Sequence, residues 1–127
     1  MSGQVPTILC VEDEADLLDD LASELREAGY TVIEAADGLS ALTAITLGGI
    51  DLVLCDVQLP GIDGLGILRR LRENAEAASS VRFALVTAYS DSHLRAEAEA
   101  LAVDALIVKP IDYDQLLELV PRLLAGD

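Results

Sequence analysis

Short apolar runs alternate along this chain with longer segments in which apolar residues recur at helical spacing. The five runs cover residues 7–11, 31–35, 51–55, 83–86 and 105–108 and are rich in Ile, Val and Leu. Most of them lack an alternating polar face, which is typical of strands that helices cover on both sides. The alternation predicts an α/β fold in which parallel strands are joined by right-handed helical crossovers.

The segments between the runs predict amphipathic helices, because each carries one apolar stripe. The clearest stripes are Leu17, Leu21, Leu25 and Ala28, then Leu94, Ala98 and Leu101, and then Leu116, Leu119, Val120 and Leu123. Gly29 and Gly48 fall where helices end, and four aspartates fall at N-cap positions: Asp37, Asp63, Asp91 and Asp112. Pro121 lies inside the last stripe, where a regular helix loses a hydrogen bond, so we expect a kink or a restart there.

Length, charge and hydropathy narrow the class of protein. The 127 residues predict one domain over 1–127, and the 52% hydrophobic content is enough for a folded core. A net charge of −15 disfavours direct binding to nucleic acid or to anionic membranes. The longest uncharged stretch, residues 38–50, is too short to span a bilayer, and no secretory signal precedes the acidic run that starts at Glu12. We therefore expect a cytoplasmic protein with no membrane segment, and Cys10 and Cys55 as buried, inert thiols.

Polar residues follow four of the five predicted strands. Glu12 and Asp13 come after the first, Asp56 after the third, Thr87 after the fourth and Lys109 after the fifth. The carboxyl ends of parallel strands meet at one edge of a sheet, so these side chains should converge. The sequence thus predicts three carboxylates, one hydroxyl and one ammonium group in one cleft.

Such a cluster has a definite chemistry. Three neighbouring carboxylates repel one another unless a hard divalent cation neutralises them, and Mg²⁺ is the natural candidate because no His or Cys ligand set is nearby. Lys109 is the only lysine in the chain, beside seven arginines. A cation, an ammonium and a hydroxyl group together suit a phosphoryl group, and a carboxylate beside them can be its nucleophile. His93 and the basic run at Arg69, Arg70 and Arg72 are interpreted as solvated surface.

With these residues in place, the chain resembles the receiver domain of two-component response regulators along nearly its full length. The matching segments are residues 8–13, 54–64, 85–88 and 107–110. The resemblance implies a flavodoxin-like, doubly wound sheet of five parallel strands in the order 2-1-3-4-5, with helices on both faces. It also implies phosphoryl transfer to Asp56 from a sensor histidine kinase or a phosphotransfer protein, and signalling to a downstream protein target. Beyond self-phosphorylation and autodephosphorylation, no enzyme activity is implied.

Site roles carry over position by position. Asp56 would be the phosphoacceptor, Thr87 and Lys109 would contact the phosphoryl oxygens, and the Lys109–Pro110 peptide bond would be cis. The implied Mg²⁺ ligands are Glu12, Asp13, Asp56 and the backbone carbonyl of Gln58. Leu106 stands where the family usually has an aromatic residue, so the usual rotamer switch is altered here, and Tyr89 is the substitute ring that we predict.

Three other kinds of phosphate-handling protein fit the sequence less well. A dehalogenase-type phosphatase needs an aspartate where Gln58 stands, a flavodoxin needs a phosphate-binding first loop where this chain has Glu12, and a P-loop protein needs Ser or Thr where Pro110 follows the lysine.

No output domain is visible in the 127 residues. The chain is either a single-domain regulator acting through its fourth helix, fifth strand and fifth helix, or a piece of a longer protein. The alternative function is a phosphorylation-independent, receiver-like scaffold.

Overall fold

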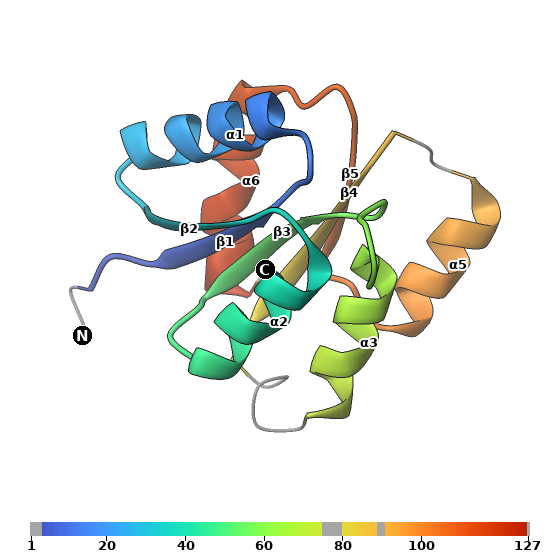
Figure 1. The fold of residues 1–127 in the computed structure, drawn as a ribbon. Helices are drawn as coiled ribbons and strands as arrows, with labels where there is room; N and C mark the ends of the chain where they lie inside the picture. Colours follow the sequence, from blue (N-terminus) through green and yellow to red (C-terminus); the bar gives the residue numbers. More distant parts are fainter. Residues whose placement is uncertain (1–3, 75–79, 89–90, 127) are drawn as a thin grey trace.

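The computed structural model describes residues 4–74, 80–88 and 91–126, which form alternating strands and helices (Figure 1). The strands are β1 (Thr7–Val11), β2 (Thr31–Ala35), β3 (Leu52–Asp56), β4 (Arg82–Thr87) and β5 (Ala105–Val108). The helices are α1 (Ala15–Glu27), α2 (Gly38–Leu47), α3 (Gly64–Glu73), α5 (Ser92–Ala100) and α6 (Tyr113–Ala125).

The strands form one parallel sheet in the order β2-β1-β3-β4-β5, which confirms the predicted topology. Because successive side chains of a strand point to opposite faces, the sheet builds two apolar cores. Leu9, Val53 and Phe83 pack on one face with residues of α2, α3 and α5, whereas Ile8 and Leu52 pack on the other with residues of α1 and α6. Figure 1 shows the same division of the helices between the two faces.

The predicted helix boundaries hold well at their starts. Asp37, Asp63, Asp91 and Asp112 each accept a backbone N–H from the first turn of the helix that follows. Such bonds satisfy one of the N–H groups that a helix leaves unpaired at its start. At the other end of two helices, Gly29 and Gly48 have φ angles of +102° and +84°, as predicted from their positions.

Three predicted details are wrong. The buried stripe of α1 is Leu18, Leu21, Ala22 and Leu25, whereas Leu17 is half-buried and Ala28 is exposed. The adjacent leucines at 17 and 18 made both stripes compatible with helical spacing. Helix α6 also runs through Pro121, so the restart considered there does not occur, and the kink considered beside it stays a prediction. Pro121 is exposed, so its ring does not have to be accommodated in the core.

The third error concerns Arg72, which is not part of a solvated face. Its guanidinium group donates to the carbonyl oxygens of Leu101 (2.9 Å) and Ala102 (2.8 Å) just after α5, and lies 3.5 Å from the carboxylate of Asp104. That carboxylate also accepts the N–H of Phe83 at 2.7 Å. Arg72 therefore ties α3 to the carboxyl end of α5 and to the start of β5.

Candidate functional site

The carboxyl edge of the sheet brings the predicted site residues together. Glu12 follows β1, Asp56 ends β3, Thr87 ends β4 and Lys109 follows β5. The observed β3 and β4 each extend one residue beyond the predicted runs, because Asp56 pairs with Val86 and Thr87 pairs with Val108 in the sheet. Asp56 and Thr87 are therefore held by the sheet itself rather than by loops, which fixes their backbone positions.

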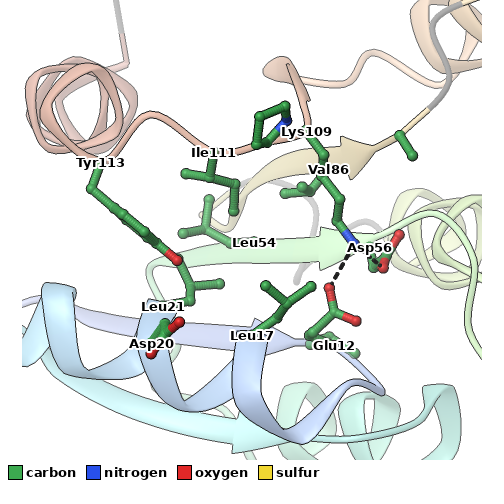
Figure 2. Close-up of a pocket in the computed structure, with 13 residues that line it drawn as sticks. Glu12, Leu17, Asp20, Leu21, Leu54, Asp56, Val86, Lys109, Ile111 and Tyr113 are labelled. Atoms are coloured by element: carbon green, nitrogen blue, oxygen red, sulfur yellow. Dashed lines mark hydrogen bonds and ion pairs between the residues drawn. The ribbon is translucent and has the colours of Figure 1, made fainter.

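Lys109 is the centre of the polar cluster (Figure 2). Its ammonium nitrogen Nζ lies 2.8 Å from Oδ2 of Asp56 and 2.9 Å from Oε1 of Glu12. In the strand order β4 lies between β3 and β5, so the lysine side chain crosses the end of β4 to reach Asp56. A flexible four-carbon stem with a compact charge suits this reach, which explains why lysine rather than arginine stands here.

Backbone N–H groups hold the other carboxylate oxygens. The N–H of Gln58 donates to Oδ1 of Asp56 at 3.1 Å, and the N–H of Glu14 donates to Oε2 of Glu12 at 3.0 Å. Both carboxylates are thus oriented by one backbone donor and by the shared ammonium group. This leaves Asp56 in one fixed orientation at the mouth of the cleft.

Burial makes the electrostatics of the cluster strong. Glu12 and Asp56 are only 5% and 6% exposed, and burial raises the pKa of the Glu12 carboxyl. For Lys109, burial favours the neutral amine, but the hydrogen bonds to Asp56 and Glu12 outweigh it and raise the pKa to about 12. The lysine therefore stays protonated at every physiological pH, and it offsets only part of the negative charge around it.

The donor set fits a hard divalent cation. Oxygen atoms of Glu12, Asp13 and Asp56 lie within 4.8 Å of one another, and Asp13 is exposed while the other two are buried. These three residues would hold such a cation and would leave room for water ligands beside the exposed Asp13, and Mg²⁺ usually keeps several waters when proteins bind it. The ligand role of the Gln58 carbonyl stays a prediction, since the contact observed for Gln58 is made through its N–H.

Thr87 and the turn after β5 complete the edge. Thr87 is 2% exposed, and its carbonyl oxygen accepts the N–H of Lys109 at 2.7 Å. The Lys109–Pro110 peptide bond is cis, as predicted. Leu106 is half-buried in β5, and the substitute ring predicted at Tyr89 lies outside the described residues.

Two adjoining cavities open at the cluster, and sequence reasoning missed one of them. A cavity of about 310 Å³ surrounds the polar side, with Asp13, Asp56, Gln58 and Lys109 in its wall. A second cavity, of about 520 Å³, extends from Asp56 and Lys109 between α1 and the segment that joins β5 to α6 (Figure 2). Its walls are mostly apolar and combine residues distant in sequence. The one hint in the sequence is the pair of adjacent leucines, Leu17 and Leu18, of which only Leu18 belongs to the buried stripe of α1.

The remaining candidates have no part in the site. His93 is exposed and pairs with Glu97 at 3.1 Å, which confirms its assignment to the surface. Cys10 and Cys55 are buried thiols in β1 and β3. Burial raises the pKa of Cys10 to about 12 and raises that of Cys55 as well, so neither forms a reactive thiolate at neutral pH.

Comparisons with known proteins agree with this geometry. Residues 8–121 match the family model of the response regulator receiver domain. Sporulation initiation phosphotransferase F of Bacillus subtilis is 33% identical over 117 residues, 92% of each chain. The sensory transduction protein RegX3 of Mycolicibacterium smegmatis is 35% identical over 118 residues, and the chain spans 50% of its length. The response regulator TrrA of Thermotoga maritima, solved in complex with Mg²⁺-BeF, has a TM-score of 0.81 and 35% identity, with 94% of this chain and 99% of that chain covered.

The chain therefore belongs to the response regulator receiver domains, the signalling modules of two-component systems, and the predicted resemblance is confirmed. The five parallel strands in the order 2-1-3-4-5 are the flavodoxin-like fold of that family. Members of this family are signalling modules and in general not enzymes. In the part of the chain that the structure describes, no helix is long and apolar enough to cross a membrane.

Proposed function

We propose that Asp56 accepts a phosphoryl group from the phosphohistidine of a sensor histidine kinase or a phosphotransfer protein. The observation that carries this proposal is the position of the Asp56 carboxylate, which the Lys109 ammonium and the Gln58 N–H hold at 2.8 and 3.1 Å. Glu12 and Asp13 lie beside it. Asp56 is therefore the carboxylate at the centre of a site built for phosphoryl oxygens.

The transfer is a single displacement at phosphorus. A carboxylate oxygen of Asp56 attacks the phosphorus atom, an O–P bond forms, the P–N bond to the donor imidazole breaks, and the imidazole nitrogen keeps the electron pair. Lys109 neutralises negative charge on the phosphoryl oxygens, and Thr87, at the end of the neighbouring β4, supplies a hydroxyl group to them. Autodephosphorylation is the attack of water on the same phosphorus atom, with Asp56 as the leaving group.

Glu12, Asp13, Asp56 and the backbone carbonyl of Gln58 would hold Mg²⁺ in this site. The ion would supply positive charge to the phosphoryl oxygens. This charge is needed because the single positive charge of Lys109 does not balance three carboxylates. The Mg²⁺-BeF complex of TrrA, which is 35% identical to this chain, supports the choice of ion. Mg²⁺ should raise the melting temperature of the wild-type protein, and less so that of the Asp13→Asn variant.

The signal would pass to a downstream protein through the surface formed by α5, β5 and α6. This surface contains a groove of about 290 Å³ along β5 and α6, with Leu106 and Val108 in its wall, and Val108 is exposed. A net charge of −15 makes this domain itself unsuited to direct contact with nucleic acid or anionic membranes. We place its action in the cytoplasm, where kinase donors present their phosphohistidine. The alternative of a phosphorylation-independent scaffold has no observation in its favour.

Labelling with a small phosphodonor tests the proposal. Incubation with Mg²⁺ and acetyl phosphate should add the mass of one phosphoryl group to the wild-type protein and none to Asp56→Asn. Asp63→Asn is the matched control, because Asp63 caps α3 near the same edge and asparagine caps a helix equally well. Equal labelling of Asp56→Asn and wild type would contradict the assignment, and absence of labelling in both would favour the scaffold alternative.

A further inference from the structure

The phosphoacceptor opens onto two cavities of different chemistry. The polar cavity of about 310 Å³ and the apolar cavity of about 520 Å³ share four wall residues: Leu17, Asp56, Ala88 and Lys109. A group on Asp56 therefore faces both. Asp13, Asp56 and Lys109 line the polar cavity, where the proposed cation and the phosphoryl group would lie, whereas Glu12 lines the apolar cavity. The mostly apolar remainder of the larger cavity has no role in that chemistry.

The apolar cavity has the walls of a binding site for a small organic group. Its volume lies within the range of ligand pockets, about 300–1,000 Å³. Leu17 and Leu21 of α1 face Ile111 and Tyr113 across it, and Leu54 of β3 lies at its base (Figure 2). Tyr113 and the carboxylate of Asp20 lie at the end far from Lys109, so polar groups close the apolar part of the cavity at that end.

We propose that this cavity binds the hydrocarbon chain of acyl phosphates, so that the protein accepts phosphoryl groups from short-chain acyl phosphates in preference to acetyl phosphate. This inference rests on the proposed role of Asp56. An oxygen of Asp56 attacks phosphorus, the O–P bond to the acyl group breaks, and the carboxylate of the corresponding short-chain acid leaves with the electron pair. No further reactant is needed.

The charges of the site favour an acyl phosphate whose phosphoryl end lies in the polar cavity and whose acyl chain lies in the apolar one. The phosphoryl end of an acyl phosphate is anionic and meets Lys109 and the proposed cation, whereas the acyl chain is neutral and adds no repulsion near Glu12 and Asp20. The carboxylate produced is anionic and is repelled by the same residues, which favours its release. An acyl chain with an anionic end would be repelled by Asp20 and lose this advantage.

A series of acyl phosphates measures the effect directly. Acetyl, propanoyl and butanoyl phosphate have nearly the same leaving group but differ by one methylene group each. Complete transfer of one methylene group from water to an apolar wall favours binding by about fourfold. We therefore expect the second-order rate constant for labelling Asp56, followed by intact mass, to rise two- to fourfold with each methylene group.

Variants locate the effect in the cavity. Ile111→Trp should fill the cavity, and Leu17→Asn should place a polar group with the same number of heavy side-chain atoms in its wall. Both should flatten the dependence on chain length, measured relative to each variant's own rate with acetyl phosphate. Leu47→Trp is the control, because Leu47 is exposed on α2 at the other face of the sheet, and the dependence should match that of wild type.

Phosphoramidate carries no hydrocarbon, so its reaction tests the role of Asp56 independently of the apolar cavity. If it labels wild-type Asp56 but the rate constants for the acyl series are flat or fall with chain length, the proposed function stands and this inference is wrong. If no donor labels Asp56, both are wrong. A rise with chain length that persists in Ile111→Trp and Leu17→Asn would place the hydrocarbon elsewhere and would also overturn the inference.

Discussion

Ala102 is a residue whose replacement by glycine should stabilise the protein. Its φ angle is +56°, and it is the only residue other than glycine with a positive φ in the ranges 4–74, 80–88 and 91–126. The left-handed conformation costs an L-residue about 1–2 kcal/mol, and glycine avoids that cost. Glycine in turn loses about 0.5–1 kcal/mol more conformational entropy on folding. The side chain of Ala102 is exposed, so no packing is lost.

The net expectation for Ala102→Gly is a gain of about 0.5–1 kcal/mol in the free energy of unfolding. The hydrogen bond from Arg72 to the carbonyl oxygen of residue 102 is made by the backbone and is retained. Urea denaturation measures the change, which should raise the midpoint by about 0.3–0.5 M at an unchanged slope.

Ala96 provides the matched control. It is exposed within α5, six residues before Ala102, so Ala96→Gly makes the same chemical change in a helical conformation. It should lower the free energy of unfolding by about 1 kcal/mol. The two substitutions should therefore have opposite signs. If both destabilise the protein by the same amount, the conformation at residue 102 is not strained and the reasoning is refuted.

Three further predictions concern charge and reactivity. Lys109→Arg should slow labelling of Asp56 by about tenfold or more although the charge is kept, because the planar guanidinium cannot reproduce the contacts of Nζ with Asp56 and Glu12; a wild-type rate would contradict this. The hydrogen bond from the Ser40 N–H lowers the pKa of Asp37 below its ordinary 3.8. The contribution of this carboxylate to stability is therefore complete above pH 3.8 and is lost as the pH falls through the lowered pKa. The destabilisation caused by Asp37→Ala, measured by urea denaturation, should be present at pH 7 and shrink below about pH 4. Cys10 and Cys55 should resist a thiol reagent in the folded protein and react in urea, and rapid reaction in the native state would show that the sheet opens more readily than its burial indicates.

Sequence alone predicted the parts of the fold that depend on local chemistry. The strand runs, the aspartate N-caps and the convergence of Glu12, Asp56 and Lys109 follow from patterns that each span a few residues, combined with the rule that parallel strands end at one edge. The contact of Lys109 with both carboxylates, however, depends on where β5 lies relative to β1 and β3, which the sequence supplied only through topology.

The features that escaped prediction are tertiary. Arg72 belongs to a basic run that is typical of a solvated face, and only the approach of α5 to α3 gives its guanidinium group two carbonyl oxygens to bind. The left-handed conformation at Ala102 could not be predicted, because the residue there is not glycine. The apolar cavity likewise combines α1 with the start of α6, and no local pattern connects Leu17 with Tyr113.

The contact of Arg72 with the carboxyl end of α5 makes the two ends of that helix unequal. The carbonyl oxygens of Leu101 and Ala102, just after the helix, are held by a charged group from α3. At the amino end, the described polar contacts of Asp91 with Leu94 and of His93 with Glu97 are all made within residues 91–97. Opening of α5 should therefore begin at its amino end, which follows β4 and Thr87 in the chain. Amide hydrogens near Arg95 should exchange with solvent before those near Leu101, and Arg72→Met should remove this order by speeding exchange at the carboxyl end.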